Sequence, residues 1–347
     1  MTSAASLLLP LLTTASTRTL LVADENCIDF RLQQLPPGQQ VLSNRFDMVA
    51  RAQAANLTAH FSDFDFSTWA PGSLDLIAYR LSKEKAVVHH IANRARELLA
   101  PDGKLVVVGG KQEGIKTFAK TMGNLFATAP ELEKHGSLYR LTLARGPDSR
   151  INTAPQLDDQ HYPKLREIFR LDSGPVFSKP GLFGWDHIDA GSALLAQHLP
   201  AFFAAHGKTP QTLLDLGCGY GYLSLMAAQH GPFHITATDN CAAAITACRH
   251  NFAAHNINGE VIAADCGAGI ESRLDVILCN PPFHQGFGEE RSLTEKFLAS
   301  THRLLTKQGR ALFVVNRFVP LEGLAGNLFR RVEVVLENPS FKVVELS

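Results

Sequence analysis

The stretch Thr212-Leu-Leu-Asp215-Leu-Gly217-Cys-Gly219-Tyr-Gly221 decides the fold of this 347-residue chain. An apolar run passes into a glycine-rich turn, and a helical pattern follows at residues 223–227, which predicts a strand, a tight turn and a helix. The glycines let the backbone approach a ligand closely, and the helix N-terminus favours the negative part of that ligand. The spacing G-x-G-x-G after an acidic residue differs from the G-x-G-x-x-G of dinucleotide sites. The stretch therefore predicts the first βα unit of a doubly wound α/β sheet, with a ligand at the turn.

Two further acidic residues stand where predicted strands end. The strand at residues 234–238 leads into Asp239, whose carboxylate can accept hydrogen bonds from both hydroxyls of a ribose. The strand at residues 260–264 leads into Asp265, which can accept from an adenine amino group. Either residue alone is as readily a helix N-cap. Because ligands of open α/β sheets bind at the carboxyl ends of the strands, we expect both carboxylates to lie at the edge that carries the glycine turn.

Asn280-Pro281-Pro282-Phe283 follows the buried-strand run 274–279. The side-chain oxygen of Asn280 can accept a hydrogen bond, and the carbonyl of Pro281 can accept a second. The two prolines stiffen the corner, because each fixes φ and restricts the residue before it. Phe283 offers a flat apolar face beside the two acceptors. The tetrapeptide predicts a site for a planar group with an exocyclic amino group, such as a nucleobase, although a structural proline turn would have the same sequence.

Acidic strand ends followed by N-P-P-F resemble the class I S-adenosylmethionine-dependent methyltransferases, and among them the methylases of amino groups, over residues 175–347. Further stretches are similar to the bacterial two-domain guanine-N2 methyltransferases of 16S rRNA in the small ribosomal subunit: Pro180-Gly181-Leu-Phe183, Asp189-Ala-Gly191-Ser192, Phe283-His284-Gln285 and Ser340-Phe341-Lys342-Val343. The resemblance implies S-adenosylmethionine as cofactor, held by Asp215, Gly217, Gly219, Gly221, Asp239, Asp265 and Asn280. It also implies the catalytic residues Asn280, Pro281 and Phe283.

Other activities use the same motif and stay open at this point. A methyltransferase of large-subunit rRNA has the same layout. A protein glutamine methylase usually carries Tyr in place of Phe283 and has a helical N-terminal module. A DNA adenine methylase would need a separate target-recognition segment, which we do not find. A ribosome-assembly factor without catalysis would not need the intact set of glycines, acids and Asn280.

An internal repeat indicates that the N-terminal part has the same fold. Leu74-Asp-Leu-Ile77 recurs 200 residues later as Leu274-Asp-Val-Ile277, and a helix, a glycine turn and a buried strand follow each copy. The candidate first strand at residues 19–23 leads into Asp24 without a glycine cluster, and residues 78–81 replace the N-P-P-F loop. We predict tandem Rossmann-like methyltransferase domains: a degenerate copy at 1–150 that docks substrate, a linker and lead-in at 151–174, and a catalytic domain with a seven-stranded sheet at 175–347. The basic docking candidates are Lys83, Lys85, Lys111, Lys116 and Lys120.

Composition limits the remaining choices. Apolar content of 45% and charged content of 19% are those of a globular protein. Lys and Arg number 33, as do Asp and Glu, so a nucleic-acid partner would have to bind a local basic patch. The apolar stretch at residues 7–12 is short and broken by proline, and the six cysteines include no C-x-x-C. We therefore expect a cytoplasmic, monomeric enzyme that binds ribosomal RNA and uses neither membrane nor metal.

Overall fold

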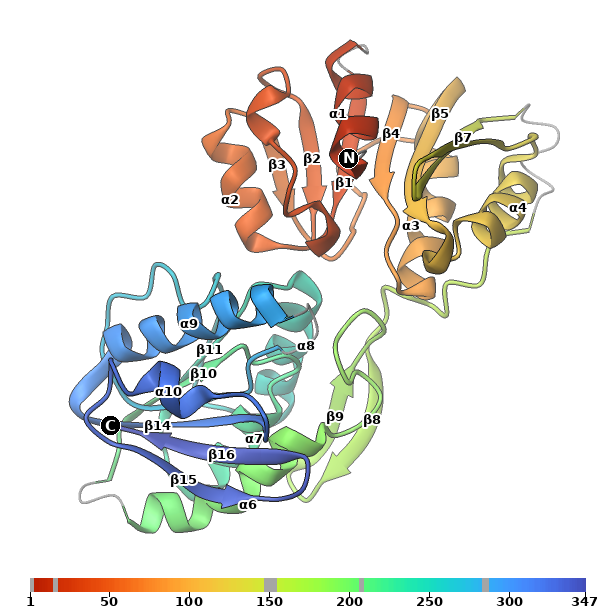
Figure 1. Ribbon diagram of the computed structural model, residues 1–347. Helices are drawn as coiled ribbons and strands as arrows, with labels where there is room; N and C mark the ends of the chain where they lie inside the picture. The colour runs from red at the N-terminus through yellow and green to blue at the C-terminus, as the bar shows by residue number, and fades with distance from the viewer. Residues whose placement is uncertain (1–2, 15–17, 147–154, 206–208, 283–286) are drawn as a thin grey trace. The chain divides into compact units, whose positions relative to one another are not determined.

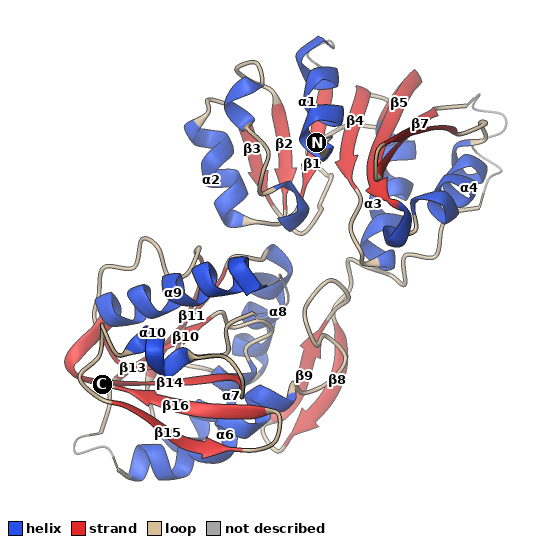
Figure 2. Cartoon of the chain, in the orientation of Figure 1, coloured by secondary structure: helices blue, strands red, loops and turns tan. Residues whose placement is uncertain are grey.

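The computed structural model describes residues 3–14, 18–146, 155–205, 209–282 and 287–347, and the chain divides into two compact units, Met1–Lys164 and Leu165–Ser347. Each unit is a sheet with helices packed on it (Figure 1). The helices and strands of both units are distinguished by colour in Figure 2. No helix in the described part of the chain is long and apolar enough to span a membrane.

The first unit contains a seven-stranded sheet in the order β3-β2-β1-β4-β5-β7-β6. Its strands are β1 (Thr19–Ala23), β2 (Gln40–Ser43), β3 (Thr58–Phe61), β4 (Leu74–Arg80), β5 (Leu99–Gly110), β6 (Glu131–His135) and β7 (Leu138–Ala144). Its helices are α1 (Ala4–Thr14), α2 (Phe46–Ala54), α3 (Lys85–Leu98) and α4 (Ile115–Phe126), with one-turn 3-10 helices η1 (Glu25–Cys27), η2 (Leu32–Gln34) and η3 (Lys111–Glu113). Alternate residues of β1 enter different cores: Leu20 packs with α3 and α4, and Leu21 packs with α1 and α2.

The second unit repeats this architecture behind an antiparallel hairpin, β8 (Arg166–Leu171) and β9 (Gly174–Ser178). Its sheet has the order β12-β11-β10-β13-β14-β16-β15. The strands are β10 (Thr212–Leu216), β11 (His234–Asp239), β12 (Gly259–Ala263), β13 (Leu274–Cys279), β14 (Leu305–Asn316), β15 (Val332–Glu337) and β16 (Phe341–Leu346). The helices are α6 (Ala190–Ala204), α7 (Tyr222–Ala227), α8 (Ala242–Ala254), α9 (Phe287–Leu304) and α10 (Leu321–Ala325), with the 3-10 turn η4 (Ala228–His230).

The two sheets have the same strand order and the same irregularity. In each, the first five strands of the sheet order are parallel, and a terminal antiparallel hairpin completes the sheet. The pairing of β4 with β5 shifts register between Leu74 and Leu76, and that of β13 with β14 shifts between Leu274 and Val276. The predicted fold of two tandem Rossmann-like domains is confirmed, and so is the spacing of 200 residues between β4 and β13.

The boundary between the units differs from the predicted linker at 151–174. Residues 147–154 lie outside the described residues. After them, the backbone at Leu157 exchanges two hydrogen bonds with the side chain of Asn93, at 2.8 and 2.9 Å. Tyr162 is fully buried in the core of the first unit and donates its hydroxyl proton to Asp63 at 2.5 Å. Residues 155–164 therefore belong to the first unit, and the lead-in to residue 174 belongs to the hairpin of the second.

Candidate active site at the carboxyl edge of the second sheet

The glycine turn lies in the middle of the carboxyl edge of its sheet. Strand β10 pairs with β11 on one side and β13 on the other, so that Leu216 is opposite both Thr238 and Cys279. Gly217, Gly219 and Gly221 have φ of +83°, +54° and +90°, which other residues rarely adopt. A Cβ on Gly221 would lie 2.8 Å from the Cys248 sulfur, whereas one on Gly219 would meet no atom within 4 Å. The turn is thus packed tightly at its end and open in front of Gly219.

Asp215 lies beneath this turn, and only one of its two carboxylate oxygens accepts hydrogen bonds from described residues. The carboxylate is 1% exposed, and its Oδ2 accepts hydrogen bonds from the Ser224 backbone N–H at 2.9 Å and hydroxyl at 2.7 Å. The other oxygen, Oδ1, is buried and has no partner among the described residues. Burial raises the pKa of the Asp215 carboxyl to about 6. An unpartnered buried acceptor beside an open glycine turn fits a cofactor that carries a cationic or amino group.

Asp239 ends β11, on the side of the glycine turn away from β13. Its Oδ2 accepts from the Gly219 backbone N–H at 2.9 Å, and its Oδ1 accepts from the Cys241 N–H at 2.8 Å. These two bonds fix the carboxylate against the turn. Asp265, beyond the end of β12, forms an ion pair with Lys296 of α9 and is partly exposed. The sheet thus brings Asp215, Asp239 and Asp265 to one edge.

Asn280 follows β13, on the opposite side of the turn from Asp239. Its Nδ2 donates to Asp189 Oδ2 and to Ser192 Oγ, each at 2.8 Å. Pro281 is buried at the next position, and the role of its carbonyl as the second acceptor stays a prediction. Phe283, predicted to stack on the base, and its neighbour His284 lie outside the described residues. Two of the three predicted catalytic residues therefore lie next to the predicted cofactor turn.

Residues to which no sequence pattern assigned a role brace this edge: Asp189 and Ser192, quoted above only as part of a family-like stretch, and Asn251. Asp189 caps α6 by accepting from the Ser192 N–H at 2.8 Å, and this cap is what contacts Asn280. Asn251, fully buried on α8, donates to the carbonyls of Phe177 and Tyr220 and accepts from the Phe177 N–H, all at 2.8 Å. It ties the hairpin strand β9 to the glycine turn. An Asp just before a helical pattern is a capping signal, but its contact 91 residues away leaves no local trace.

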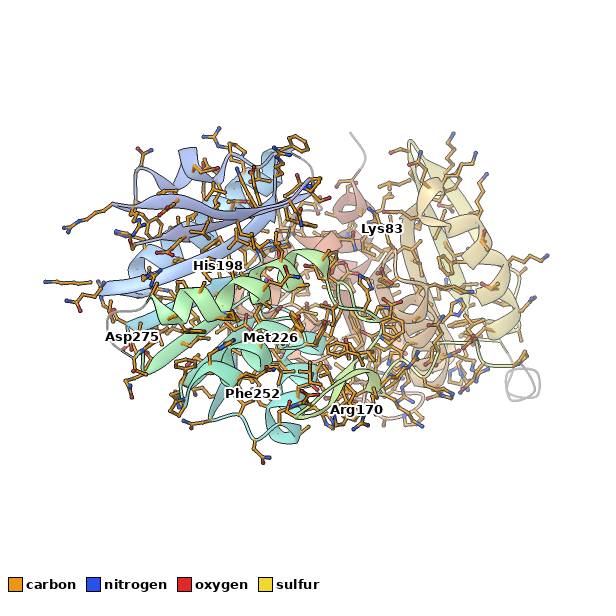
Figure 3. All side chains as sticks on the ribbon, turned by 90° about the horizontal axis from the view of Figure 1, so that it is seen from below. Lys83, Arg170, His198, Met226, Phe252 and Asp275 are labelled. Carbon is orange, nitrogen blue, oxygen red and sulfur yellow. The ribbon has the colours of Figure 1, made fainter. Side chains whose placement is uncertain are left out.

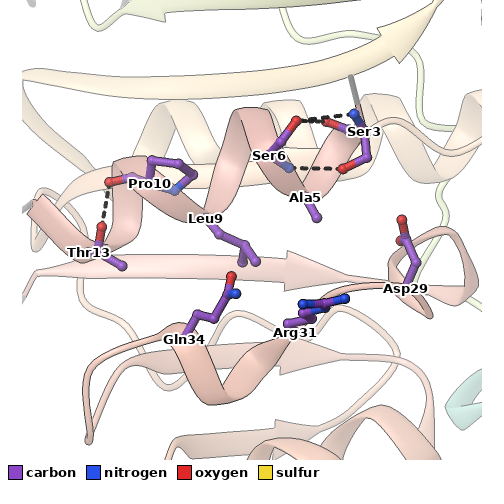
Figure 4. Close-up of a pocket in the computed structure, with 9 residues that line it drawn as sticks. All are labelled: Ser3, Ala5, Ser6, Leu9, Pro10, Thr13, Asp29, Arg31 and Gln34. Atoms are coloured by element: carbon purple, nitrogen blue, oxygen red, sulfur yellow. Dashed lines mark hydrogen bonds between the residues drawn. The ribbon is translucent and has the colours of Figure 1, made fainter. Parts of the chain in front are cut away.

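Elsewhere in the described chain, candidate functional sites have fewer supporting features. A hollow of about 600 Å³ in the first unit lies between α1 and the segment after η1, and Figure 4 shows its lining of hydroxyls, Asp29, Arg31 and Gln34. It contains none of the predicted site residues. Within the described ranges, no three His, Cys, Asp or Glu residues lie so that they could hold a metal ion.

Comparison with known families agrees with this geometry. Residues 173–345 match the family described as the methyltransferase small domain, and residues 12–153 match its N-terminal companion domain. The chain belongs to this methyltransferase family. The two matches follow each other along almost the whole chain, in the order of the two units.

Individual relatives extend the likeness over both units. The ribosomal RNA small subunit methyltransferase C of Shewanella amazonensis is 28% identical over 298 residues, which are 84% of this chain and 83% of the relative. That of Actinobacillus succinogenes is 28% identical over 334 residues, 94% and 93% of the two chains. The structure of the T. thermophilus 16S rRNA N2 G1207 methyltransferase, in complex with AdoMet and guanosine, matches the fold with a TM-score of 0.79 at 21% identity. That likeness covers 98% of this chain and 91% of the other.

Proposed function

We propose that this chain transfers a methyl group from S-adenosylmethionine to the exocyclic N2 of a guanine in 16S rRNA of the small ribosomal subunit. One observation carries the proposal. Asn280 follows the strand next to the glycine turn, and its amide nitrogen is bound by Asp189 and Ser192, so its oxygen is the end left for a substrate amino group. The names of the family relatives support the choice of RNA.

For this reaction, two hydrogen-bond acceptors at the substrate amino group matter more than a general base. The sulfonium cofactor supplies an already activated methyl group, so no covalent nucleophile of the protein is required. The lone pair of guanine N2 is delocalised into the ring. Hydrogen bonds from its two protons to Asn280 Oδ1 and the Pro281 carbonyl would favour a more pyramidal nitrogen and stabilise its developing positive charge. Once the methyl group is bound, the nitrogen would lose one proton to water, and the demethylated cofactor would leave as a neutral thioether. The predicted stacking of Phe283 on the base would align it, which requires an unpaired or flipped-out guanine.

The cofactor lies along the same edge. Asp215, with its unpartnered buried oxygen, and the backbone of Gly217, Gly219 and Gly221, with open space at Gly219, would hold its methionine part. Asp239, fixed against the turn by its two backbone bonds, would accept from the ribose hydroxyls. Asp265 would accept from the adenine amino group, and Asn280, on the other side of the glycine turn, would contact both the cofactor and the base.

The first unit docks the RNA. Lys83 (labelled in Figure 3) and Lys85 follow β4, Lys111 follows β5, and Lys116 and Lys120 lie one turn apart on α4. All five are exposed, and they lie just after the carboxyl ends of their strands or on the helix that comes next. Reversing Lys83 and Lys111 to Glu should raise KM for RNA and flatten its salt dependence, with no change in cofactor affinity. A salt dependence equal to wild type would exclude this role.

Product analysis tests the proposal. The purified chain is incubated with labelled S-adenosylmethionine and either small ribosomal subunits or free 16S rRNA, and the RNA is digested to nucleosides. Label in N2-methylguanosine from 16S rRNA is the expected result. Label in 23S rRNA, in a protein glutamine or in no product would contradict it. We propose further that the enzyme is a monomer in the cytoplasm, where its substrate is, which sedimentation of the pure protein and fractionation of cells would check.

A further inference from the structure

Side chains at the start of α6 fix the orientation of the Asn280 amide group. Both of its N–H protons have acceptors: the Asp189 carboxylate and the Ser192 hydroxyl, each 2.8 Å from Nδ2. An ionised carboxylate can only accept hydrogen bonds, so the nitrogen end of the amide must face Asp189. Among the described residues, none donates to Asn280 Oδ1. The side chain therefore presents its acceptor, and not its donors, away from α6.

Asp189 is itself held in place by the start of α6. Its Oδ2 accepts from the Ser192 N–H at 2.8 Å, and its backbone carbonyl accepts from the Ala193 N–H at 2.9 Å. A Cβ on Gly191 would lie 3.1 Å from Asp189 Oδ2 and 3.2 Å from the Phe341 ring, so the helix start is closely packed around the carboxylate. Ser192 is 9% exposed. One oxygen of Asp189 thus joins the helix cap to the amide of Asn280.

We infer that Asp189 and Ser192 are positioning residues that make the pocket selective for an amino group. This inference rests on the proposed function and assigns a specificity determinant to it. A substrate that presents N–H protons meets the oxygen of Asn280, whereas one that presents a carbonyl at the same place meets a second acceptor and no donor. The carboxylate also polarises the amide, since hydrogen bonds in a chain strengthen one another, and this raises the negative charge on Oδ1.

The decisive variants separate orientation from helix capping. Asp189→Ser keeps an N-cap side chain for the Ser192 N–H but removes the carboxylate from Asn280. It should lower kcat roughly 10- to 100-fold, the scale on which orienting partners act, with melting temperature and cofactor affinity near wild type. Asp186→Ser is the matched control, because Asp186 is exposed and pairs only with His187 among the described residues. It should leave kcat unchanged.

A swap of the two side chains gives the sharper test. Asn280→Asp alone places two carboxylates in contact and should lose most activity, because one of them must take up a proton. Adding Asp189→Asn restores a donor–acceptor pair in the reverse sense, since the amide introduced on the helix cap then donates to the carboxylate introduced after β13, and an oxygen still faces the substrate. The double variant should exceed Asn280→Asp in kcat at least about tenfold, an interaction of about 1.4 kcal/mol.

The outcomes separate this inference from the proposed function. Wild-type kcat in Asp189→Ser, or a double variant no more active than Asn280→Asp, overturns the positioning role while N2-methylation of 16S rRNA by the wild type stands. A wild-type chain that leaves 16S rRNA unmethylated overturns the proposed function and this inference with it.

Discussion

The carboxyl edges of the two sheets have the same backbone topology but carry different side chains at matching positions. Where the second sheet has Asp215, the register of β1 and β4 puts Leu21 in the first. Where the second sheet has Asn280, the first has Arg80, because β4 and β13 share a spacing of 200 residues. Arg80 forms a two-bond ion pair with Glu113, at 2.6 and 2.8 Å, and donates to the carbonyl of Leu81 at 2.9 Å.

The two edges also differ in what lies in front of their buried acids. The second sheet leaves a buried oxygen of Asp215 unpartnered beside an open glycine turn, which a cofactor can use. The first sheet also has a buried carboxylate oxygen without a partner among the described residues, Asp24 Oδ2, but no glycine turn lies in front of it, and Arg80 and Glu113 take the place that corresponds to Asn280. Asp24, directly after β1, caps η1 by accepting from the Asn26 N–H, and Arg80 satisfies strand-end carbonyls. An ion pair thus stands in the first sheet where the second sheet has Asn280.

Removal of Arg80 should have the largest effect on stability. The pair with Glu113 is nearly buried, with side chains 12% and 16% exposed. Arg80→Ala leaves Glu113 unpaired and should lower the free energy of unfolding by roughly 3–5 kcal/mol, measured by urea titration. Arg310→Ala, which breaks the comparably buried pair with Glu345, is the control in the second unit. Weaker cofactor binding in Arg80→Ala, at a temperature where it is folded, would mean that the first sheet still contributes to the site.

The buried acid of the first edge should make the first unit sensitive to pH. Burial, with Glu25 nearby, raises the pKa of Asp24 to about 7. The folded pKa exceeds the unfolded one, so the stability contributed by Asp24 is full below about pH 4 and is lost as pH rises through 7. The loss is at most about 4 kcal/mol, from ~1.4 kcal/mol per pKa unit. Asp24→Asn should remove this slope in urea titrations between pH 5 and 8, and an unchanged slope would rule out Asp24 as its source.

Loss of the Asp239 carboxylate should weaken cofactor binding and leave the fold intact. Asp239→Ala removes a charged acceptor, which should cost about 1–3 kcal/mol of binding free energy for S-adenosylmethionine, measured by calorimetry. Ser43→Ala, at the corresponding position at the end of β2 in the first sheet, is the matched control and should bind normally. Equal affinities in the two variants would make Asp239 a structural residue only.

The smallest expected effect is the pH dependence of cofactor affinity. The pKa of Asp215 is raised to about 6, so the carboxyl takes up a proton below that pH and loses its attraction for a cationic group. Affinity for S-adenosylmethionine should fall about tenfold per pH unit below 6 and stay flat above it. Asp215→Asn should flatten the profile, whereas Asp24→Asn should not change it. A profile that keeps its inflection in Asp215→Asn would point to another group.

Sequence patterns predicted the features that depend on residues close together in the sequence. Strands with continuous apolar runs, glycines at positive φ and the carboxyl-edge rule were enough to bring Asp239 and Asn280 to one edge. The repeat predicted the sheet of the first unit. Three features had no local signal: the contact of Asp189 with Asn280, the ion pair that fills the first edge, and the packing of Tyr162 with the first unit. Each depends on side chains far apart in sequence, and polar residues near Tyr162 looked like a linker because their partners lie on α3 and near β3.

Methyl transfer by Asn280→Ala tests the central claim most directly. The variant and the wild type are compared for label transferred from S-adenosylmethionine to N2 of guanine in 16S rRNA, at saturating cofactor, with cofactor affinity measured in parallel. We predict a loss of about 10²–10³ in kcat, the scale for removing one preorganised polar contact to a developing charge, with cofactor affinity retained because the glycine turn and Asp239 are untouched. Wild-type activity in Asn280→Ala would remove this residue from the reaction and contradict the account of the second edge.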